Sequence, residues 1–401
     1  MRIRGLNWGI GPVPADHTKT HDPFKRRILP ALCGYNWAVD HNAQWRVSGA
    51  FNARGKYRNP DYVINVGDNF YWGGVDCHCG NMYQRCDTKQ WKWIYEEMWK
   101  GPGIDDKPWL GVLGNHDWGG WQFNKGWDQV IAYSWGGLPE STGRWLQPAI
   151  YWAAPVHYPG FNVDWLFVDS NIFDVRESPW WDPEHNICGA QHSGTYAGAG
   201  CGHSGPYSVF DCSKWFGGLW DRQSGWLDAK LKESVQNKVD WQFVVTHFPA
   251  WWGEASWKYL AFQYGIDMFV TGHVHRQDCL EQWDWRNQFK PTVTIITGGG
   301  GGITSEFWPD NNGNDDQYGF VDATLWKDKV KVQMVSHGGQ IRKTHVFTKR
   351  EAQWKPKEYK GYFSIPSEEA AYAKLHPPKP NQAGTRGDQR FLAETGLSDL
   401  G

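Results

Sequence analysis

The chain has 401 residues, which is enough for one large domain or two of ordinary size. Its 41 basic and 43 acidic residues give a net charge of −2, which argues against binding to nucleic acid or to an acidic membrane surface. No apolar run reaches the roughly 20 residues that a membrane-spanning helix needs, so we expect no transmembrane segment. Residues 1–6 are too few and too polar to form a signal peptide.

In the first half of the chain, apolar runs that stop at turn residues predict strands, and apolar residues three or four positions apart predict helices. Residues 10–60 are interrupted by Pro, Gly and Asn, with one amphipathic piece near residues 24–32. Because residues 2–6 already resemble a core strand, any leader would precede this numbering. We expect strands at residues 2–6, 61–66, 109–113, 149–154 and 163–168, and helices at residues 89–100 and 124–133.

Residues 174–220 form an insertion rich in Gly, Trp, Cys and His, and loops of this length are usually functional or held by cross-links. After it we expect helices at residues 224–235 and 256–264, strands at 241–246, 266–270 and 292–297, and a closing hairpin at 319–326 and 329–336. The alternation predicts a four-layer α/β/β/α sandwich, two mixed sheets flanked by helices, over residues 1–348. Residues 349–401, rich in Pro, Lys and Glu, are expected to form an extended C-terminal tail that straps a neighbouring subunit.

The eight cysteines lie in loop-like, Gly-rich segments rather than in strands. Cys77, His78, Cys79 and Cys86 could form a zinc knuckle, but no second Cys/His pair follows at the usual spacing. We therefore favour disulfide bonds, which predict a secreted, extracellular or lumenal protein. The cysteines are Cys33, Cys77, Cys79, Cys86, Cys188, Cys201, Cys212 and Cys279.

The chain contains 29 tryptophans, more than a core of this size needs, and several fall in loops, at residues 180–181, 251–252 and 283–285. Trp is favoured where one edge of the ring stays hydrated, at interfaces and on ligand platforms. Two interpretations stay open. The loops are simply Trp-rich, or the protein packs against copies of itself or against sugars.

Four predicted strands end in residues that bind metal ions. The apolar run at residues 266–270 stops at a glycine and presents two histidines one residue apart. Ligands bind at the carboxyl ends of strands in open α/β sheets, so residues at these ends are expected to meet. The four ends carry Asp68 and Tyr71; Asn115, His116 and Asp117; His247; and His273 and His275. This combination of carboxylate, amide and imidazole groups predicts a metal site.

A two-metal site needs one carboxylate that bridges both ions, and Asp68 is the natural bridge. His116 is not needed as a ligand, so it can face the substrate and donate a proton to a leaving oxygen, with Asp117 orienting its ring. A hydroxide held between two metal ions would attack phosphorus in line.

At these motifs the sequence resembles the calcineurin-like metallophosphoesterases. The resemblance rests on residues 67–71 (Gly-Asp-Asn-Phe-Tyr), 114–117 (Gly-Asn-His-Asp), 247–249 (His-Phe-Pro) and 272–275 (Gly-His-Val-His). The tyrosine of the first block is typical of purple acid phosphatases. Residues 131–134 and 223–227 are most similar to the small, tartrate-resistant type. The resemblance covers about residues 3–344 and excludes the tail.

The resemblance implies a binuclear metal-dependent phosphatase that hydrolyses phosphate monoesters, with two metal ions, one iron and one iron, zinc or manganese. Asp68 would bridge the ions. Tyr71 and His275 would belong to the ferric position, and Asn115, His247 and His273 to the divalent position. His116 would be the proton donor.

One position departs from the family. The family opens with Gly-Asp-Trp-Gly, whose aspartate binds the ferric ion, whereas this chain has Asn7 in the sequence Leu-Asn-Trp-Gly. Asn7 still offers an oxygen but carries no charge, and a trivalent ion depends most on carboxylates. Asp16 and Asp40 are alternatives, although neither follows a convincing strand. The competing hypothesis is therefore a catalytically weakened phosphatase-fold protein with a structural, self-assembling or binding role.

Overall fold

The computed structural model describes residues 36–349, except residues 72, 83–84, 137, 178–185, 194–198 and 302–304. The expected strand at residues 2–6, the amphipathic piece at 24–32, the tryptophans at 180–181 and the tail after residue 349 lie outside the described residues. The domain boundary after residue 348 stays a prediction. Among the described residues, no helix is both long enough and apolar enough to cross a membrane.

A six-stranded mixed sheet forms the centre of the fold. Four of its strands, β5, β6, β7 and β9, are parallel, and antiparallel strands close both edges. Every residue of β6, β7 and β9 is buried, as expected of parallel strands covered on both faces. In sheet order the strands are β4 (Trp152–Tyr158), β5 (Phe161–Val168), β6 (Trp241–Thr246), β7 (Met268–Thr271), β9 (Val293–Thr297) and β8 (Gln277–Leu280).

Two three-stranded sheets accompany it. The first is parallel and contains β1 (Val63–Asn65), β2 (Trp109–Gly111) and β3 (Trp145–Leu146). The second is antiparallel and contains β10 (Gly319–Leu325), β11 (Lys329–Ser336) and β12 (Ile341–Thr348). The mixed α/β class is thus confirmed, but the described residues form three hydrogen-bonded sheets where the sequence predicted two.

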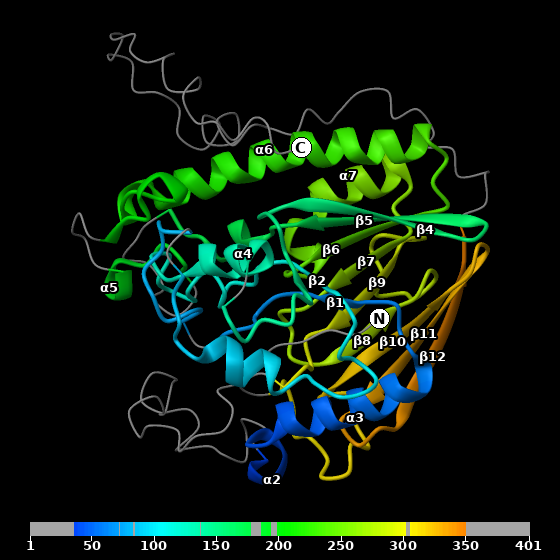
Figure 1. The fold of residues 1–401 in the computed structure, drawn as a ribbon. Coiled ribbons are helices and arrows are strands. Elements are labelled where there is room, and N and C mark those ends of the chain that lie inside the picture. Colours follow the sequence, from blue (N-terminus) through cyan, green and yellow to red (C-terminus); the bar gives the residue numbers. More distant parts are fainter. Residues whose placement is uncertain are drawn as a thin grey trace. The chain divides into compact units, whose positions relative to one another are not determined.

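Helices cover these sheets on two sides (Figure 1). Leu227 and Leu231 of α6 pack with Leu166 of β5, and α7 adds Trp257 to the same buried cluster. On the other side, Phe51 of α3 contacts Trp109 of β2 and Phe320 of β10, with ring centroids 5.6 and 5.1 Å apart. The longer helices are α3 (Ala43–Arg58), α4 (Trp127–Trp135), α6 (Val209–Gln236) and α7 (Glu254–Tyr264). The short ones are α2 (Trp37–Asp40), α5 (Ala190–Ser193), η2 (Trp91–Glu96), η3 (Asn171–Asp174), η5 (Gly202–Ser204) and η6 (Ala250–Gly253).

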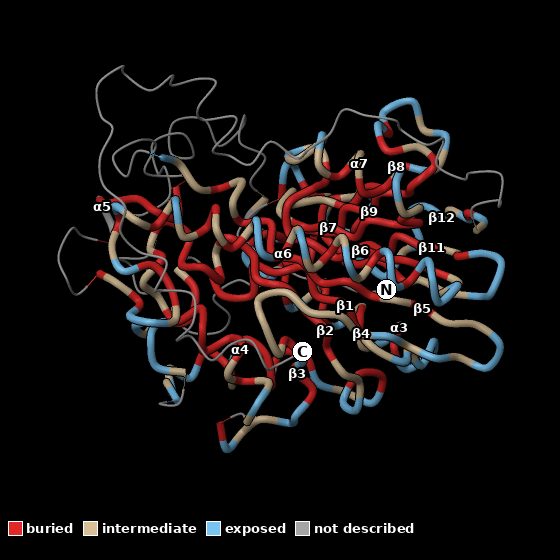
Figure 2. The backbone as a smooth tube through the Cα atoms, turned by 90° about the horizontal axis from the view of Figure 1, so that it is seen from above, coloured by how far each residue is buried: buried red, intermediate tan, exposed pale blue. Residues whose placement is uncertain are grey.

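Between the sheets lies an apolar core of alternating strand residues. Val163 and Phe243 of the six-stranded sheet share one buried cluster with Ile64 of β1 and with Val321 of β10. Because successive side chains of a strand point to opposite faces, Val63 and Phe320 belong instead to the cluster that includes Phe51. Figure 2 shows the central strands as mostly buried chain.

Most predicted elements are present, and the differences have local causes. The predicted helix at residues 224–235 is the end of α6, which begins at Val209, inside the expected insertion. The hydroxyl of Ser208 accepts a hydrogen bond from the amide of Phe210 and caps this start. Helix α3 was not predicted, because polar residues and glycine occupy some of its buried positions and interrupt the helical spacing of apolar residues. The short or exposed strands β3, β8 and β12 were also missed.

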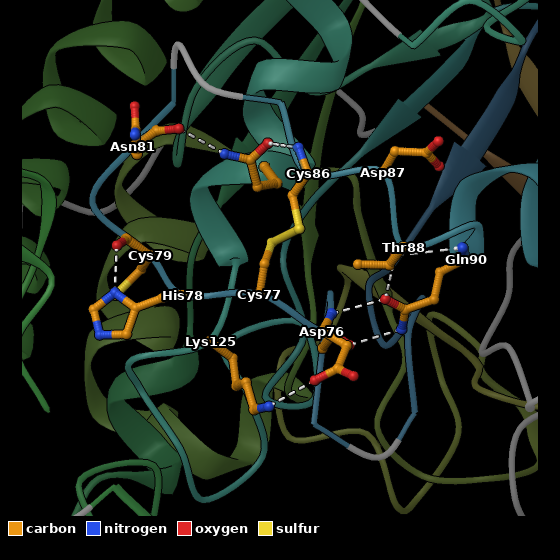
Figure 3. Close-up of a disulfide and its surroundings, with 12 residues drawn as sticks. Asp76, Cys77, His78, Cys79, Asn81, Cys86, Asp87, Thr88, Gln90 and Lys125 are labelled. Atoms are coloured by element: carbon orange, nitrogen blue, oxygen red, sulfur yellow. Dashed lines mark hydrogen bonds and ion pairs between the residues drawn. A yellow bond between two sulfur atoms is a disulfide. The ribbon is translucent and has the colours of Figure 1, made fainter.

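The preference for disulfide bonds is confirmed. Cys77 pairs with Cys86 (Figure 3). Cys79 pairs with Cys201 and Cys188 with Cys212, so the zinc-knuckle alternative is wrong. The last two bonds tie down the segment that the sequence predicted to be cross-linked. Cys279 is a buried free thiol, and Cys33 lies outside the described residues.

Tryptophan serves both the core and the surface. Eight tryptophans are among the largest fully buried side chains: Trp91, Trp99, Trp109, Trp118, Trp145, Trp165, Trp241 and Trp257. The core therefore uses more tryptophan than the sequence suggested. Other tryptophans are exposed, most of all Trp285 at 86% and Trp283 at 72%, both in the connection from β8 to β9.

One buried ion pair offers a test of these packing arguments. Arg144 and Glu96 lie 2.9 Å apart with side chains 4% and 5% exposed, and the Arg144 guanidinium also donates to the carbonyl of Trp99. We predict that Arg144→Met lowers the free energy of unfolding by about 3–5 kcal/mol, because it leaves the Glu96 charge buried and unpaired. The measurement is urea denaturation with the disulfides intact.

The double variant Arg144→Met/Glu96→Gln is the matched control. It removes both charges, so it should be more stable than Arg144→Met alone. Equal stability of the two variants would contradict the role of the unpaired charge.

Candidate metal centre

The candidate site lies where the carboxyl ends of strands from two sheets meet. Asp68 and Asn115 follow β1 and β2, which are parallel neighbours. His247 follows β6 and His273 follows β7, which are parallel neighbours in the six-stranded sheet. The predicted residues are thus brought together from four separate strand ends, as the position of the strands requires.

Asp68 has a central position. Its Oδ2 accepts a hydrogen bond from the hydroxyl of Tyr71 at 2.8 Å and lies 3.3 Å from Nε2 of His247. Its Oδ1 accepts from the backbone amide of His116 at 2.9 Å. Asp68 has φ +58°, a left-handed conformation that is costly for a residue with a side chain. The carboxylate is therefore held between the two sheets at the expense of local backbone energy.

The orientation of His247 and Asn115 follows from their outer hydrogen bonds. Nδ1 of His247 lies 2.7 Å from the carbonyl of Val66, so Nδ1 carries a proton and Nε2 is the atom turned toward Asp68. Nε2 of His247 lies 3.0 Å from Oδ1 of Asn115. Two electron-pair donors this close, both near Asp68, are arranged as ligands to a common ion would be.

His273 completes a group of three ligand residues. One possible ligand atom from each of Asp68, His247 and His273 lies within 4.8 Å of the others. His273 also has a left-handed φ, +61°, so two of these three residues occupy a conformation that non-glycine residues rarely adopt. Strained backbone of this kind is concentrated at functional sites.

Tyr71 and His275 also lie beside Asp68, because the Tyr71 hydroxyl donates to Oδ2, the same oxygen that His247 approaches. The hydroxyl of Tyr71 is 3.1 Å from Nε2 of His275. The backbone of His275 is fixed by Glu306, whose carboxylate accepts from the His275 amide and whose own amide donates to the His275 carbonyl. Tyr71, Asp68 and His275 thus form a second cluster of oxygen and nitrogen donors that shares Asp68 with the first.

The electrostatics favour the metal-binding protonation states of Asp68 and His273 only. Asp68 raises the pKa of His247 against the effect of burial, and burial together with Asp68 raises the pKa of Tyr71. Burial alone would raise the pKa of Asp68, but His247, His116 and His273 together lower it below its ordinary value. Burial lowers the pKa of His273 well below its ordinary value, and His247 adds to this effect. Asp68 is therefore an anion and His273 a neutral imidazole at neutral pH, as metal ligands must be.

His116 and Asp117 have separate environments. His116 is half-buried, with its ring centroid 4.2 Å from that of Tyr71. Asp117 is fully buried and accepts hydrogen bonds from the amides of Gly114 and Asn69 and from the Asn69 side chain. The two bonds from Asn69 tie the two strand-end loops together. The orientation of the His116 ring by Asp117 stays a prediction.

Sequence reasoning missed Asp174. The side chain of Asn115 donates from Nδ2 to Oδ2 of Asp174 at 3.0 Å, which turns Oδ1 of Asn115 toward His247. Asp174 ends the short helix η3 and is buried, and burial raises its pKa to about 7. It is separated from Asn115 by 59 positions, so no local motif connects the two.

The residues considered for the missing charge are only partly described. Asn7 and Asp16 lie outside the described residues. Asp40 is buried at the end of α2, where its carboxylate accepts hydrogen bonds from the Asn36 amide and the Tyr318 hydroxyl. Asp40 therefore has a structural task, and it is not one of the three clustered ligand residues.

The segment that contains the candidate site matches a known protein family. A model of the calcineurin-like phosphoesterase family matches residues 40–277, which contain Asp68, Tyr71, Asn115, His116, His247, His273 and His275. The chain belongs to this family. Its members bind divalent metal ions and cleave phosphate esters, and the donor set described above suits such ions.

Individual relatives are distant. The chain is 28% identical to tartrate-resistant acid phosphatase type 5 of Sus scrofa over 103 residues. These residues make up 26% of this chain and 25% of that protein. The match thus spans a quarter of the curated relative's length. Among solved structures, one similar to this chain is GAP50, the anchor in the inner membrane complex of Plasmodium, with a TM-score of 0.51. The sequences are 18% identical, and the match covers 79% of this chain and 87% of that one. A purple acid phosphatase from yellow lupin has a TM-score of 0.43 and 16% identity over 77% and 50%.

The role of Asp174 leads to a prediction about metal affinity. Asp174→Ala removes the acceptor that orients Asn115, so we expect metal affinity to fall by about 10–100-fold, the usual effect of losing an outer hydrogen-bond partner of a ligand. The measurement is titration of the metal-free protein with Zn²⁺ or Mn²⁺ by calorimetry. Asp174→Asn keeps an acceptor oxygen and should retain more of the affinity. Equal affinity of wild type and Asp174→Ala would contradict this role.

Proposed function

We propose that the protein is a metal-dependent phosphatase that hydrolyses phosphate monoesters with two metal ions. The observation that carries the proposal is the sharing of Asp68 between two donor clusters, one with His247 and His273 and one with Tyr71 and His275. A shared carboxylate with separate nitrogen donors for each ion is what a two-metal site requires.

The residues divide between two ion positions. Asn115, His247 and His273, with Asp68, would hold a divalent ion, which we expect to be iron, zinc or manganese. Tyr71 and His275, with Asp68 and Asn7, would hold the second ion, which in the related purple acid phosphatases is ferric. Bound metal ions supply a nucleophile derived from water and neutralise charge on the phosphate.

His116 is proposed as the proton donor to the leaving oxygen. Its backbone amide is fixed on Asp68, and its ring remains partly exposed beside Tyr71, so it is anchored without being enclosed. A positioned imidazole of this kind can deliver a proton to the leaving oxygen of a bound ester. The disulfides support a secreted or lumenal location for this activity.

A second candidate function is assembly or binding on a phosphatase scaffold. It is favoured by Asn7, which supplies no charge, and by Trp283 and Trp285, whose exposed rings are of the kind enriched at interfaces. The Plasmodium structure with a similar fold is that of an anchor in a membrane complex. In this case Trp283, Trp285 and the C-terminal tail would contact other subunits.

The role of His116 predicts a dependence on the leaving group. His116→Gln should lower kcat by about 10²–10⁴-fold for an alkyl phosphate, because an alkoxide leaves poorly without a proton. The loss should be smaller for p-nitrophenyl phosphate, whose leaving group needs little protonation. Metal content should be unchanged. His157→Gln, at an exposed histidine of β4, is the control. Equal losses for both substrates would contradict the role of His116 as proton donor.

The first experiment measures metal content, the absorption spectrum and p-nitrophenyl phosphate turnover for the wild type and Asn7→Asp. We expect two ions per chain and turnover in the wild type, with tighter binding of the second ion in Asn7→Asp because a carboxylate replaces a neutral amide. Wild type without metal and without turnover, with both restored in Asn7→Asp, would overturn the enzymatic proposal and favour assembly or binding.

A further inference from the structure

An exposed tryptophan contacts the candidate metal centre. Trp252 lies in the short helix η6, and its ring centroid is 5.3 Å from that of His273, with the two ring planes at 84°. The side chain is nevertheless 43% exposed. Trp252 therefore touches a proposed ligand of the divalent position and still presents part of its indole ring to solvent.

The surroundings of Trp252 fix the position of its ring. Its amide donates to the carbonyl of Pro249 at 3.0 Å, and the amide of Phe248 donates to the hydroxyl of Ser170, which follows β5, at 2.9 Å. The ring of Phe248 is fully buried, with its centroid 5.0 Å from that of Trp252 and 4.1 Å from that of His273. The indole thus rests on a packed aromatic base that also supports the histidine.

The two neighbouring tryptophans of η6 have different tasks. A 3₁₀ helix has about three residues per turn, so consecutive side chains point in different directions. Trp251 packs against the buried cluster that contains Leu260 of α7 and Phe269 of β7. Trp252 instead contacts Phe248 and His273. Of this pair, Trp251 belongs to the core and Trp252 to the metal centre.

Asp68 connects the surroundings of Trp252 with the proposed proton donor. Its carboxylate accepts from the amide of His116 at 2.9 Å, and one of its oxygens lies within 4.8 Å of a ring nitrogen of His273. His273 and His116 are therefore close neighbours of one carboxylate. The phosphate of a bound ester must lie over the ions with its leaving oxygen near His116. The organic group of that ester then extends over a site that Trp252 borders.

We propose that Trp252 is a specificity-determining residue, which selects phosphate monoesters whose organic group is a flat ring attached at the ester oxygen. The ring packs against the exposed part of the indole, which removes apolar surface of both from water and adds the attraction between aromatic rings. A short open-chain group covers less of the indole and gains less. The inference rests on the proposed phosphatase function and assigns a preference of that site to one side chain.

The direct test is calorimetric titration of the zinc-loaded protein with phenylphosphonate and with methylphosphonate, neither of which can be hydrolysed. The wild type should bind phenylphosphonate about ten-fold more tightly, and Trp252→Leu should lose most of this preference while its affinity for methylphosphonate stays the same. Trp252→Phe keeps an aromatic ring and should retain more of the preference. No preference in the wild type, or an unchanged preference in Trp252→Leu, would overturn the proposal.

The matched control is Trp285→Leu, which changes another exposed tryptophan. Trp285 lies in the connection from β8 to β9. Because these strands are antiparallel, the connection lies at the amino end of β9, whereas the metal centre lies at the carboxyl ends of the parallel strands. Trp285→Leu should therefore keep the preference of the wild type.

A second measurement separates this inference from the proposed function. With the metal-loaded protein, Trp252→Leu should reduce kcat/KM for phenyl phosphate about ten-fold more than for propyl phosphate, mainly through KM, because the packing is present in both the ground state and the transition state. A preference for phenylphosphonate that depends on Trp252, without turnover of either ester, would refute the phosphatase and leave the ring-binding role. Turnover of both esters with equal losses in the variant would refute the role of Trp252 and leave the phosphatase.

Discussion

The close approach of two strand-end loops is the constraint on which the site depends. A Cβ atom at Gly67 would lie 2.4 Å from the backbone nitrogen of Gly114, and one at Gly114 would lie 2.2 Å from Oδ1 of Asp68. Only glycine fits at both positions. This contact places the Asp68 carboxylate between the ends of β1 and β2, within reach of His247 from the other sheet. Asp117 then ties the same loops through Gly114 and Asn69.

The strand ends were predictable because burial on both faces leaves a continuous apolar run. β6 and β7 are such strands, and the polar residues that follow them stand out in the sequence. The candidate donors could therefore be proposed from the sequence, and the structure brings the described ones together, while their binding of metal stays a prediction. Helix α3 could not be predicted, because its buried positions are diluted by polar residues and glycine.

Other features of the site depend on contacts that no local pattern encodes. Asp174 orients Asn115 across 59 positions. Trp252 contacts His273 only because η6 and the end of β7, which α7 separates along the chain, lie side by side. Residues 251–252 were noticed as a loop tryptophan pair, but their neighbours could not be read from the sequence. Tertiary packing, rather than residue type, gives these side chains their roles.

The charge available to the two proposed ion positions is unequal. Asp68 serves both, and neutral imidazole and amide donors complete the position of Asn115, His247 and His273 for a divalent ion. The other position depends on Tyr71, whose pKa is raised well above its ordinary value by burial and by Asp68, so an ion there must displace the phenolic proton. An aspartate at position 7 would add the charge that a trivalent ion needs, and Asn7 does not. We therefore expect the first position to bind its ion more tightly, and filling of the Tyr71 position to set the activity of the protein.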